Sequence, residues 1–244
     1  MRFKHVPELP PELSGATEAA GEHDGRAAAL AAVDPTLVVD YVGRVQSAVP
    51  LVPGSEDDCC ARLQRRRGYE SRDVSRTWLT FLRALGLAAE TDEGYRRTRT
   101  EPTVERVRAG LLEGVLGAAE IGRRLRSDDA ACGDDGEDAA GDGDGEDAAD
   151  GVDGDDAAGD GVGDDAAGSV DVDDAFAAVE PLVPRWERTR TDDWESVWCE
   201  RVERLLDWLV ALDLAAPIAR EQAGGSDRYR GTKVLSETLG CSDA

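Results

Sequence analysis

The sequence predicts a mainly α-helical protein with short β-hairpins, in which two small helix-plus-hairpin units are joined through a helix and a disordered acidic insert. Three observations support this fold class. Apolar residues recur at helical spacing in several segments, and each segment follows a capping residue. One helix end and the hairpin after it occur twice in related form. Between the two copies lies a stretch of Asp, Ala and Gly that has too few large apolar residues to form a core.

The amino-terminal residues 1–33 are expected to form a flexible tail, because they are polar, rich in Pro, Gly and Ala, and without a sustained period. Only residues 26–33 favour a helical end. Arg2 and Lys4 are followed by prolines and acids, in place of the apolar run of an export signal. No stretch approaches the roughly 18 apolar residues of a membrane span. These features predict a cytoplasmic protein that does not enter a membrane.

After this tail, the sequence predicts two helices. Asp34 followed by Pro35 is a typical helix start, since Asp caps free backbone N–H groups and Pro fits the first turn. That helix ends before Pro50. Ser55 and the three acids after it begin the second helix, where the helix dipole favours negative charge. Gly68 ends the second helix directly after three arginines.

A third helix and a β-hairpin follow. Ser71 caps the helix, which ends at Gly86. Residues 87–91 and 95–100, joined by a polar turn that contains Gly94, have the pattern of a hairpin. The apolar side chains of the third helix recur at intervals of three and four residues, and they are Val74, Trp78, Phe81, Leu82 and Leu85.

Three helices and then a hairpin resemble a winged-helix domain, and the resemblance covers residues 34–100. It rests on the order and spacing of the elements and not on a residue signature. In winged-helix proteins the third helix enters the major groove of DNA, and the hairpin touches the adjacent backbone or minor groove. The resemblance therefore implies a DNA-binding domain in this part of the chain.

A single long helix, residues 101–126, is expected to connect the first unit to the insert. Thr103 caps it, and apolar residues line one side. They are Val104, Val107, Leu111, Leu112, Val115, Leu116 and Ile121.

The insert, residues 127–172, contains a nine-residue repeat. Asp-Ala-Ala occurs at 138–140, 147–149, 156–158 and 165–167. Nine-residue Gly-Asp repeats can form a calcium-binding β-roll, which needs a large apolar residue in each repeat. The positions that should hold it are Asp144, Asp153, Val162 and Asp171. A disordered spacer is therefore the favoured interpretation, and the β-roll is the alternative.

The second unit, residues 173–244, contains two predicted helices before its hairpin. A short helix stops at Pro181, and a long helix runs from Asp192 or Asp193 to Leu212.

The end of this long helix repeats the end of the third helix. Residues 81–89 match residues 208–216, and Tyr95-Arg96-Arg97-Thr98 matches Tyr229-Arg230-Gly231-Thr232. The repeat predicts a second, diverged winged-helix-like unit. A chance alignment of Leu- and Ala-rich segments is the alternative.

The formal net charge of −24 is unevenly distributed. Residues 127–175 contain 20 acids and no Lys or Arg, which leaves 32 acids against 28 bases elsewhere. From Arg62 to Arg99 there are ten arginines against five acids. The first unit therefore contains a basic region within an acidic chain.

The candidate DNA-binding residues are polar side chains of the third helix and the first hairpin. Those on the helix are expected to lie off its apolar face, where the resemblance implies that they read base edges or hold phosphates. They are Arg72, Ser75, Arg76 and Arg83 on the helix, and Arg96, Arg97 and Arg99 on the hairpin. Solvated arginines, arginines paired with carboxylates, and a protein partner are the alternatives.

The long helix of the second unit is acidic, with six acids against two arginines between Asp192 and Asp207. DNA should repel such a helix, so this unit is expected to bind a protein partner or a second copy of the chain. Trp194, Trp198 and Trp208 are expected mostly in the core. The basic and aromatic residues 185–190 are interpreted as a structured connector.

No enzyme active site is evident. Both histidines, His5 and His23, lie in the tail, and the five cysteines form no C-x-x-C pair. No Gly-rich phosphate-binding motif follows a predicted strand. The adjacent Cys59 and Cys60 are interpreted as half-buried thiols. We expect no catalytic activity, no metal site and no cofactor.

Of the 28 basic residues only Lys4 and Lys233 are lysines, and Asp and Ala are abundant. This composition resembles that of proteins from extreme halophiles, although a GC-rich genome also favours Arg and Ala. The chain is thus similar to winged-helix proteins of halophilic archaea. The resemblance implies a DNA-binding, transcription-regulator-like protein that contacts double-stranded DNA. The alternative is an adaptor that binds proteins and no nucleic acid.

Overall fold

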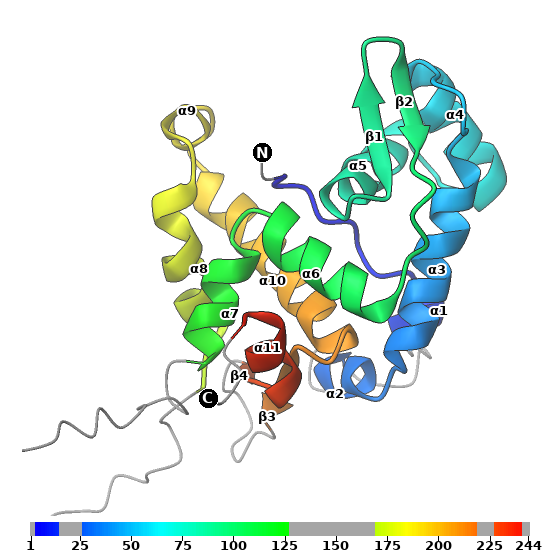
Figure 1. The fold of residues 1–244 in the computed structure, drawn as a ribbon. Helices are drawn as coiled ribbons and strands as arrows, with labels where there is room; N and C mark the ends of the chain where they lie inside the picture. Colours follow the sequence, from blue (N-terminus) through cyan, green and yellow to red (C-terminus); the bar gives the residue numbers. More distant parts are fainter. Residues whose placement is uncertain (1–2, 15–25, 127–168, 219–226, 241–244) are drawn as a thin grey trace, which may run out of the picture.

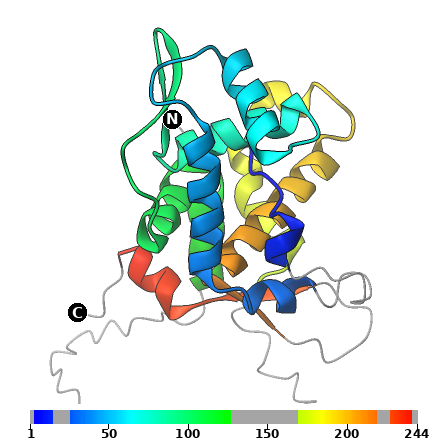
Figure 2. The same cartoon turned by 90° about the vertical axis from the view of Figure 1, so that its right-hand side faces the viewer.

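The computed structural model describes residues 3–14, 26–126, 169–218 and 227–240. Most of these residues are helical, and two antiparallel β-hairpins complete the fold. The hairpins lie at opposite ends of the molecule, with the helices between them (Figures 1 and 2). The predicted fold class, mainly α with short β-hairpins in two units, is confirmed. The acidic repeats at residues 127–168, on which the spacer and β-roll interpretations rest, lie outside the described residues.

The first unit contains its elements where the sequence predicts them. They are α3 (Pro35–Ala48), α4 (Glu56–Arg67), α5 (Arg72–Ala84), β1 (Ala88–Thr91) and β2 (Gly94–Arg97). The side chains of Asp34, Ser55 and Ser71 accept hydrogen bonds from backbone N–H groups of the helices that they precede. Gly68 ends α4 with a φ of 70°. These boundaries follow from local chemistry, because each cap satisfies backbone groups that the helix leaves free.

The predicted connecting helix is in fact two helices. α6 (Val104–Gly114) and α7 (Ala118–Arg126) are separated by a turn in which Gly117 has a φ of 90°. A continuous helix cannot pass through this conformation, which glycine adopts without strain. α7 packs against α8 (Val172–Val179) and β4 (Arg228–Gly231), so it lies with the second hairpin in space.

The remaining elements follow the predicted order of a short helix, a long helix and a hairpin. After α8 come the short 3₁₀ helix η2 (Glu180–Leu182), α9 (Arg185–Arg188), α10 (Trp194–Ala211), β3 (Ala215–Ile218), β4 and α11 (Lys233–Thr238). Trp198 and Trp208 are buried as expected, and Trp194 is partly buried. Arg188 supports the connector interpretation, since its Nη1 donates to the Glu180 carboxylate at 3.1 Å.

The internal repeat is confirmed by matching hydrogen bonds at the ends of α5 and α10. Gly86 (φ 70°) and Asp213 (φ 56°) occupy equivalent left-handed positions. Thr98 and Thr232 donate their hydroxyls to the carbonyls of these two residues, at 3.0 and 2.7 Å. The equivalent backbone bonds are Leu87 N–H to the Leu82 carbonyl and Leu214 N–H to the Leu209 carbonyl, both 2.8 Å.

Each hairpin is extended by one residue from the segment before the second helix of its unit. Gly54 forms an antiparallel bridge with Tyr95, and Val170 forms one with Tyr229. The next residue in each case is a cap, Ser55 for α4 and Asp171 for α8. The residues 169–172, predicted as the end of the insert, are therefore part of the fold.

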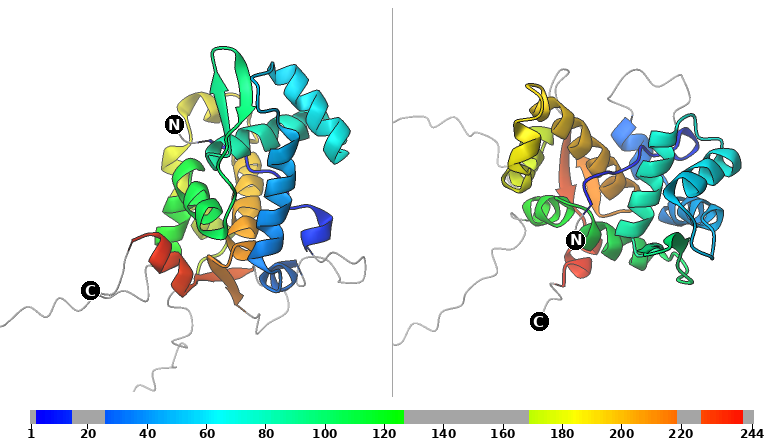
Figure 3. Two further views of the ribbon diagram at one scale, coloured as in Figure 1. Left: turned by 45° about the vertical axis from the view of Figure 1, so that its right-hand side comes forward. Right: turned by 90° about the horizontal axis from the view of Figure 1, so that it is seen from above.

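The expectation of a flexible tail is wrong for residues 3–14, whereas the helical end predicted at residues 26–33 is present. They contain α1 (Pro11–Ser14) and α2 (Arg26–Ala31), and Val6, Leu9 and Leu30 are buried. Trp208 Nε1 donates to the Pro7 carbonyl at 2.8 Å. Figure 3 shows this segment passing between α10 and the helices of the first unit. Its apolar residues are too irregularly spaced to show a period, and only tertiary packing orders them.

One hydrophobic core spans both units. The ring of Trp208, fully buried on α10, lies 4.6 Å from the ring of Phe81 and 6.0 Å from that of Trp78, both on α5. Buried residues from the amino-terminal segment and from both hairpins belong to the same cluster. Among the described helices, none combines the length and apolar character that crossing a bilayer requires.

Candidate nucleic-acid interface

Helix α5, the third helix of the first unit, buries a broad apolar face and leaves its amino-terminal end exposed. Trp78, Leu79 and Leu82 are buried against neighbouring helices, whereas Arg72 and Arg76 are exposed. The helix is amphipathic because its apolar residues recur at intervals of three and four.

Arg72 and Arg76 are paired with acids of α4. Arg76 donates to the Glu56 carboxylate through Nε at 2.8 Å and through Nη2 at 2.5 Å. Arg72 forms an ion pair with Asp57 and lies 3.8 Å from Glu56. The acids that begin α4, where the helix dipole favours them, thus also hold the first arginines of α5. The side chains of Arg72 and Arg76 remain 53% and 56% exposed.

Arg83 is placed differently, among aromatic rings. Its guanidinium lies 4.9 Å from the ring centre of Phe3 and 5.3 Å from that of Tyr95. It also forms an ion pair of 2.5 Å with Glu90 on β1, and its side chain is only 20% exposed. Arg83 therefore ties together α5, the amino-terminal segment and the first hairpin.

Ser75 does not lie off the apolar face, contrary to the expectation from the sequence. It is fully buried, and its hydroxyl donates to the Ser71 carbonyl at 3.2 Å. A serine of helix interiors often bonds the carbonyl four residues earlier, which satisfies the hydroxyl without solvent. Ser75 is thus part of the packing of the helix.

The hairpin arginines are free of ion pairs within the described part of the chain. Arg96 and Arg99 are exposed, and Arg97 is partly exposed with its Nη1 3.5 Å from the Ser47 carbonyl of α3. Strand β2 pairs Arg96 with Ala89, a small residue that leaves its side chain uncovered on that face. These three side chains form what we name the wing arginines.

Arg44 is a further basic residue near this hairpin, and it is not among the predicted contact residues. It is exposed on α3, one turn before Ser47, and its carbonyl accepts the Ser47 hydroxyl at 2.7 Å. The signal that points to it is its position off the apolar face of the first predicted helix.

The amino-terminal segment covers one side of α5. Phe3 contacts Arg83, and its backbone pairs with residues at the end of α6. Burial, followed by the nearby charges of Arg201, Lys4 and Arg76, lowers the pKa of His5. With α10 packed on another side, the accessible part of α5 is confined to its amino-terminal end.

The second unit offers a different surface at the equivalent helix. On α10, Arg201 pairs with the buried Glu187 at 3.1 Å, and Arg204 pairs with Glu200 at 3.4 Å. The exposed side chains of this helix are mostly acidic. Its hairpin, in contrast, exposes Arg228 and Arg230 on β4.

Groups that could support metal or thiol chemistry are not assembled in the described residues. Within them, no three His, Cys, Asp or Glu side chains come together as metal ligands do. Cys59 and Cys60 are fully buried, and burial raises the pKa of both thiols, so they stay protonated near neutral pH.

Comparison with known proteins identifies one family. A family model described as the Halobacterial double winged helix domain matches residues 31–143 and 145–229, which is most of the chain. No curated protein and no solved structure gives a significant match.

Proposed function

Since this chain belongs to the family of the halobacterial double winged helix domain, we propose that it is a DNA-binding regulatory protein whose first unit contacts double-stranded DNA through its wing. The family has the kind of fold that DNA-binding regulators use, and such domains are typically binding modules and not enzymes. The wing is the β1–β2 hairpin with Arg96, Arg97 and Arg99. We place this activity in the cytoplasm and assign the chain no catalytic role.

The observation that supports this proposal is the contrast between the two sets of arginines. Those of α5 have carboxylate partners, but the wing arginines have none within the described residues. Positive charges without internal partners gain most from phosphate groups. The wing also lies at one end of the molecule, away from the core (Figure 1).

The helix arginines can join the contact at low cost. Exposed ion pairs contribute about 0–1 kcal/mol, so Arg72 and Arg76 can exchange Glu56 and Asp57 for phosphates. Arg83 is too enclosed to do so, since it is held by Glu90 and two rings. We therefore propose a main contact through the wing and a minor one through the start of α5.

High intracellular salt weakens phosphate contacts through counterion release. A halobacterial DNA-binding protein must then depend more on shape and close contact than on the number of basic residues. A hairpin fits this requirement, because it can enter a groove and its alternate side chains reach both walls.

The test is fluorescence anisotropy with a duplex of about 25 base pairs. Affinity is measured over a series of salt concentrations, because its salt dependence reports the number of phosphate contacts. The triple variant Arg96→Ala, Arg97→Ala and Arg99→Ala should bind at least about tenfold more weakly, and the salt slope should fall by about 3. The matched control replaces three exposed bases elsewhere, Arg124→Ala, Arg185→Ala and Lys233→Ala. Equal affinity of both triple variants would show that the wing is not the contact.

An adaptor that binds proteins is the second candidate, and exposed apolar residues favour it. Leu51 and Val52, in the loop that pairs with the first hairpin, are 52% and 75% exposed, and Trp186 on α9 is 57% exposed. Aromatic and aliphatic side chains at the surface are typical of protein interfaces. Undetectable duplex binding by the intact chain, even at low salt, would support the adaptor. Assembly through the second unit, as a homodimer or with a protein partner, is part of both proposals.

A further inference from the structure

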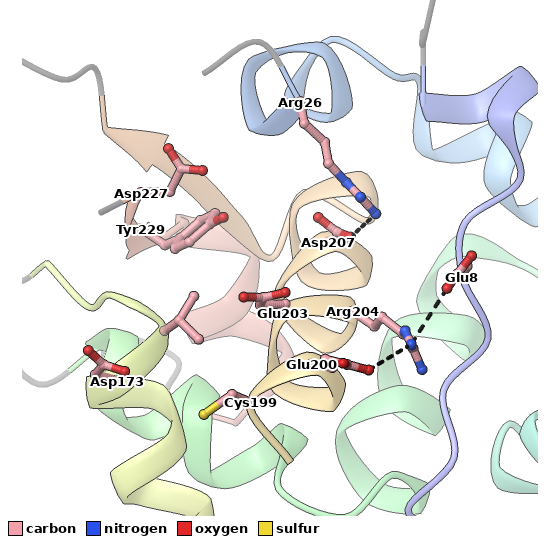
Figure 4. Close-up of a pocket in the computed structure, with 11 residues that line it drawn as sticks. Glu8, Arg26, Asp173, Cys199, Glu200, Glu203, Arg204, Asp207, Asp227 and Tyr229 are labelled. Carbon is pink, nitrogen blue, oxygen red and sulfur yellow. Dashed lines mark hydrogen bonds and ion pairs between the residues drawn. The ribbon is translucent and has the colours of Figure 1, made fainter. Parts of the chain in front are cut away.

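A pocket of about 550 Å³ opens on the second unit, beside α10 (Figure 4). Its walls come from α10, α8, β4, α2 and the amino-terminal segment. The volume falls within the range of small-molecule sites in proteins. Nothing in the proposed DNA contact uses this pocket.

Acidic side chains dominate the lining. The lining holds six carboxylates and two guanidinium groups. The carboxylates belong to Glu8, Asp173, Glu200, Glu203, Asp207 and Asp227, and the guanidinium groups belong to Arg26 and Arg204.

The two arginines balance only part of this charge. Arg26 pairs with Asp207 at 2.5 Å, and Arg204 bridges Glu8 and Glu200 at 3.5 and 3.4 Å. Within the described residues, no ion pair forms at Asp173 or Glu203. The uncompensated charge therefore lies between α8 and α10.

Tyr229 on β4 is a mostly buried side chain that reaches the pocket. The residue is only 6% exposed, and Figure 4 shows its hydroxyl directed into the pocket. No hydrogen bond joins this hydroxyl to another described residue, and the oxygen itself stays accessible from the pocket. Burial, together with the nearby charges of Asp227, Asp207 and Glu203, raises the pKa of Tyr229, so the hydroxyl keeps its proton.

The equivalent tyrosine of the first unit has a hydrogen-bond partner for its hydroxyl, so the fold does not by itself leave this hydroxyl without one. Tyr95 occupies the same place in its hairpin and donates its hydroxyl to Glu90 at 3.0 Å. The repeat thus supplies a partner in one unit and leaves the hydroxyl open in the other. An accessible hydroxyl on an otherwise buried side chain can hydrogen-bond a ligand that enters the pocket.

The carboxylates are spread around the pocket, and their spacing indicates what kind of ligand would fit. No three of them come together as ligands of one metal ion within the described residues. A ligand with separated positive charges fits better than a single ion. The ring of Tyr229 and the side chain of Val172 offer apolar surface between the charges.

We propose that this pocket binds a linear aliphatic polyamine, with one ammonium group between Glu203 and the Tyr229 hydroxyl and another at Asp173. The hydroxyl oxygen accepts a hydrogen bond from the ammonium group. The methylene segments lie along Tyr229 and Val172. Binding joins α8, α10 and β4, and it does not depend on the DNA contact proposed above.

Binding should also depend on pH through Asp207. Burial raises the pKa of this carboxyl to about 6, against the opposing effect of Arg26. The groups that face it are Arg26 on α2, Glu203 on α10, and Asp227 and Tyr229 at β4. Below pH 6 the pocket loses one negative charge, so affinity should fall as pH decreases through that value.

Isothermal titration of the full chain with spermidine, at constant ionic strength, tests the proposal. Glu203→Gln should weaken binding about tenfold, because a charged hydrogen bond is lost, and Tyr229→Phe should weaken it several-fold. The control Glu113→Gln removes an exposed acid of α6 outside this pocket and should bind like the original chain. Melting temperatures of all variants establish that each is folded.

Three results would overturn the proposal. They are no saturable spermidine binding, equal binding by Glu203→Gln and Glu113→Gln, and full displacement of spermidine by an equal concentration of Mg²⁺. The first two would mean that the acids act only as a diffuse field. The last would mean that a metal ion occupies the pocket. Duplex binding, measured separately, stays unchanged by Glu203→Gln if the two sites are independent.

Discussion

At the scale of single residues, Asp207 is a buried acid whose charge its surroundings oppose. It lies on α10 between the buried Leu206 and Trp208, and it is itself only 9% exposed. Arg26 lies close enough to attract the charged form, but desolvation has the larger effect and the pKa rises to about 6. A buried carboxylate is tolerated here because it borders a pocket and has one charged partner.

Replacing Asp207 should change how stability depends on pH. The pKa of this carboxyl rises from its ordinary value of 3.8 to about 6 in the folded chain, so the folded state binds its proton more tightly. Its stabilising effect is complete below pH 3.8 and is lost as pH rises through 6. The loss is roughly 3 kcal/mol or less, since each unit of pKa corresponds to about 1.4 kcal/mol.

Asp207→Asn should therefore be more stable than the original chain at pH 7.5, by about 1–3 kcal/mol, and similar to it at pH 4. Urea unfolding at constant high salt across this range measures the difference. Glu113→Gln, which changes an exposed acid of α6 that is not among the groups affecting Asp207, is the control. Parallel stability curves for Asp207→Asn and the original chain would contradict the assignment.

The left-handed residues after α5 and α10 allow a second prediction at this scale. Gly86 and Asp213 share one conformation, and no atom lies within 4 Å of a Cβ added at Gly86. Strain alone should decide the cost of a substitution there. Asp tolerates positive φ better than a β-branched residue does.

Gly86→Asp should cost less than about 1 kcal/mol, and Gly86→Val about 2 kcal/mol. Chemical denaturation of both variants gives the two values. Asp213→Gly tests the other copy of the turn and should change stability by less than about 1 kcal/mol. An equal loss for Asp and Val at position 86 would mean that crowding, and not backbone strain, limits the site.

At the scale of elements, helices α5 and α6 approach closely because glycines face the contact. A Cβ added at Gly114 would lie 2.1 Å from the Ala84 carbonyl oxygen, and one at Gly110 would lie 2.8 Å from the Leu85 Cα. Both obstacles are backbone atoms, which cannot rotate away. The hairpin that follows α5 and the helix that follows the hairpin are thereby fixed relative to each other.

Gly114→Ala should destabilise the chain by about 1–3 kcal/mol, because α6 must move away from α5. The control is Gly43→Ala on α3, where the added Cβ meets only the Pro102 side chain at 3.3 Å. There the better helix propensity of Ala should offset the contact, and the change should stay within about 1 kcal/mol. Thermal unfolding of both variants measures the two losses of stability. A smaller loss for Gly114→Ala than for Gly43→Ala would contradict the close approach of α5 and α6.

At the scale of the whole molecule, the two units share their core and the acidic insert interrupts the second. α7 and α8 pack against each other, and the insert connects them. Val170 exchanges two backbone hydrogen bonds of 2.8 Å with Tyr229, and Asp171 forms a capping box with Asp174. Residues 169–172, predicted as the end of the insert, are therefore part of the described fold.

Two shortened chains test where the insert ends. Replacing residues 128–168 by a short Gly-Ser linker should leave the melting temperature nearly unchanged, as expected for a spacer. Replacing residues 128–172 should lower stability by about 1–2 kcal/mol or more, because the cap and the strand pairing are lost. Circular dichroism melts at fixed salt distinguish the two. A large fall for the first replacement would refute the spacer interpretation.

The sequence by itself determined the three helices of the first unit with their caps, the long helix α10, and the repeat of the helix end and hairpin. Asp34, Ser55, Ser71 and Gly68 act on backbone groups within one turn, so their effect is readable from neighbours in the chain. The two hairpins were also predictable, because turn residues and the repeated tyrosine mark them.

Only the tertiary structure decided the position of the tail, the break between α6 and α7, and the partners of the arginines. Val6 and Leu9 join the core through residues far away in the chain, and Gly117 ends a helix that the apolar pattern would continue. Ser75, Arg76 and Arg83 share one helix, yet one is buried, one is paired at the surface and one lies between aromatic rings. Helical spacing places a side chain on a face, but the elements packed against that face determine its burial and its charge partners.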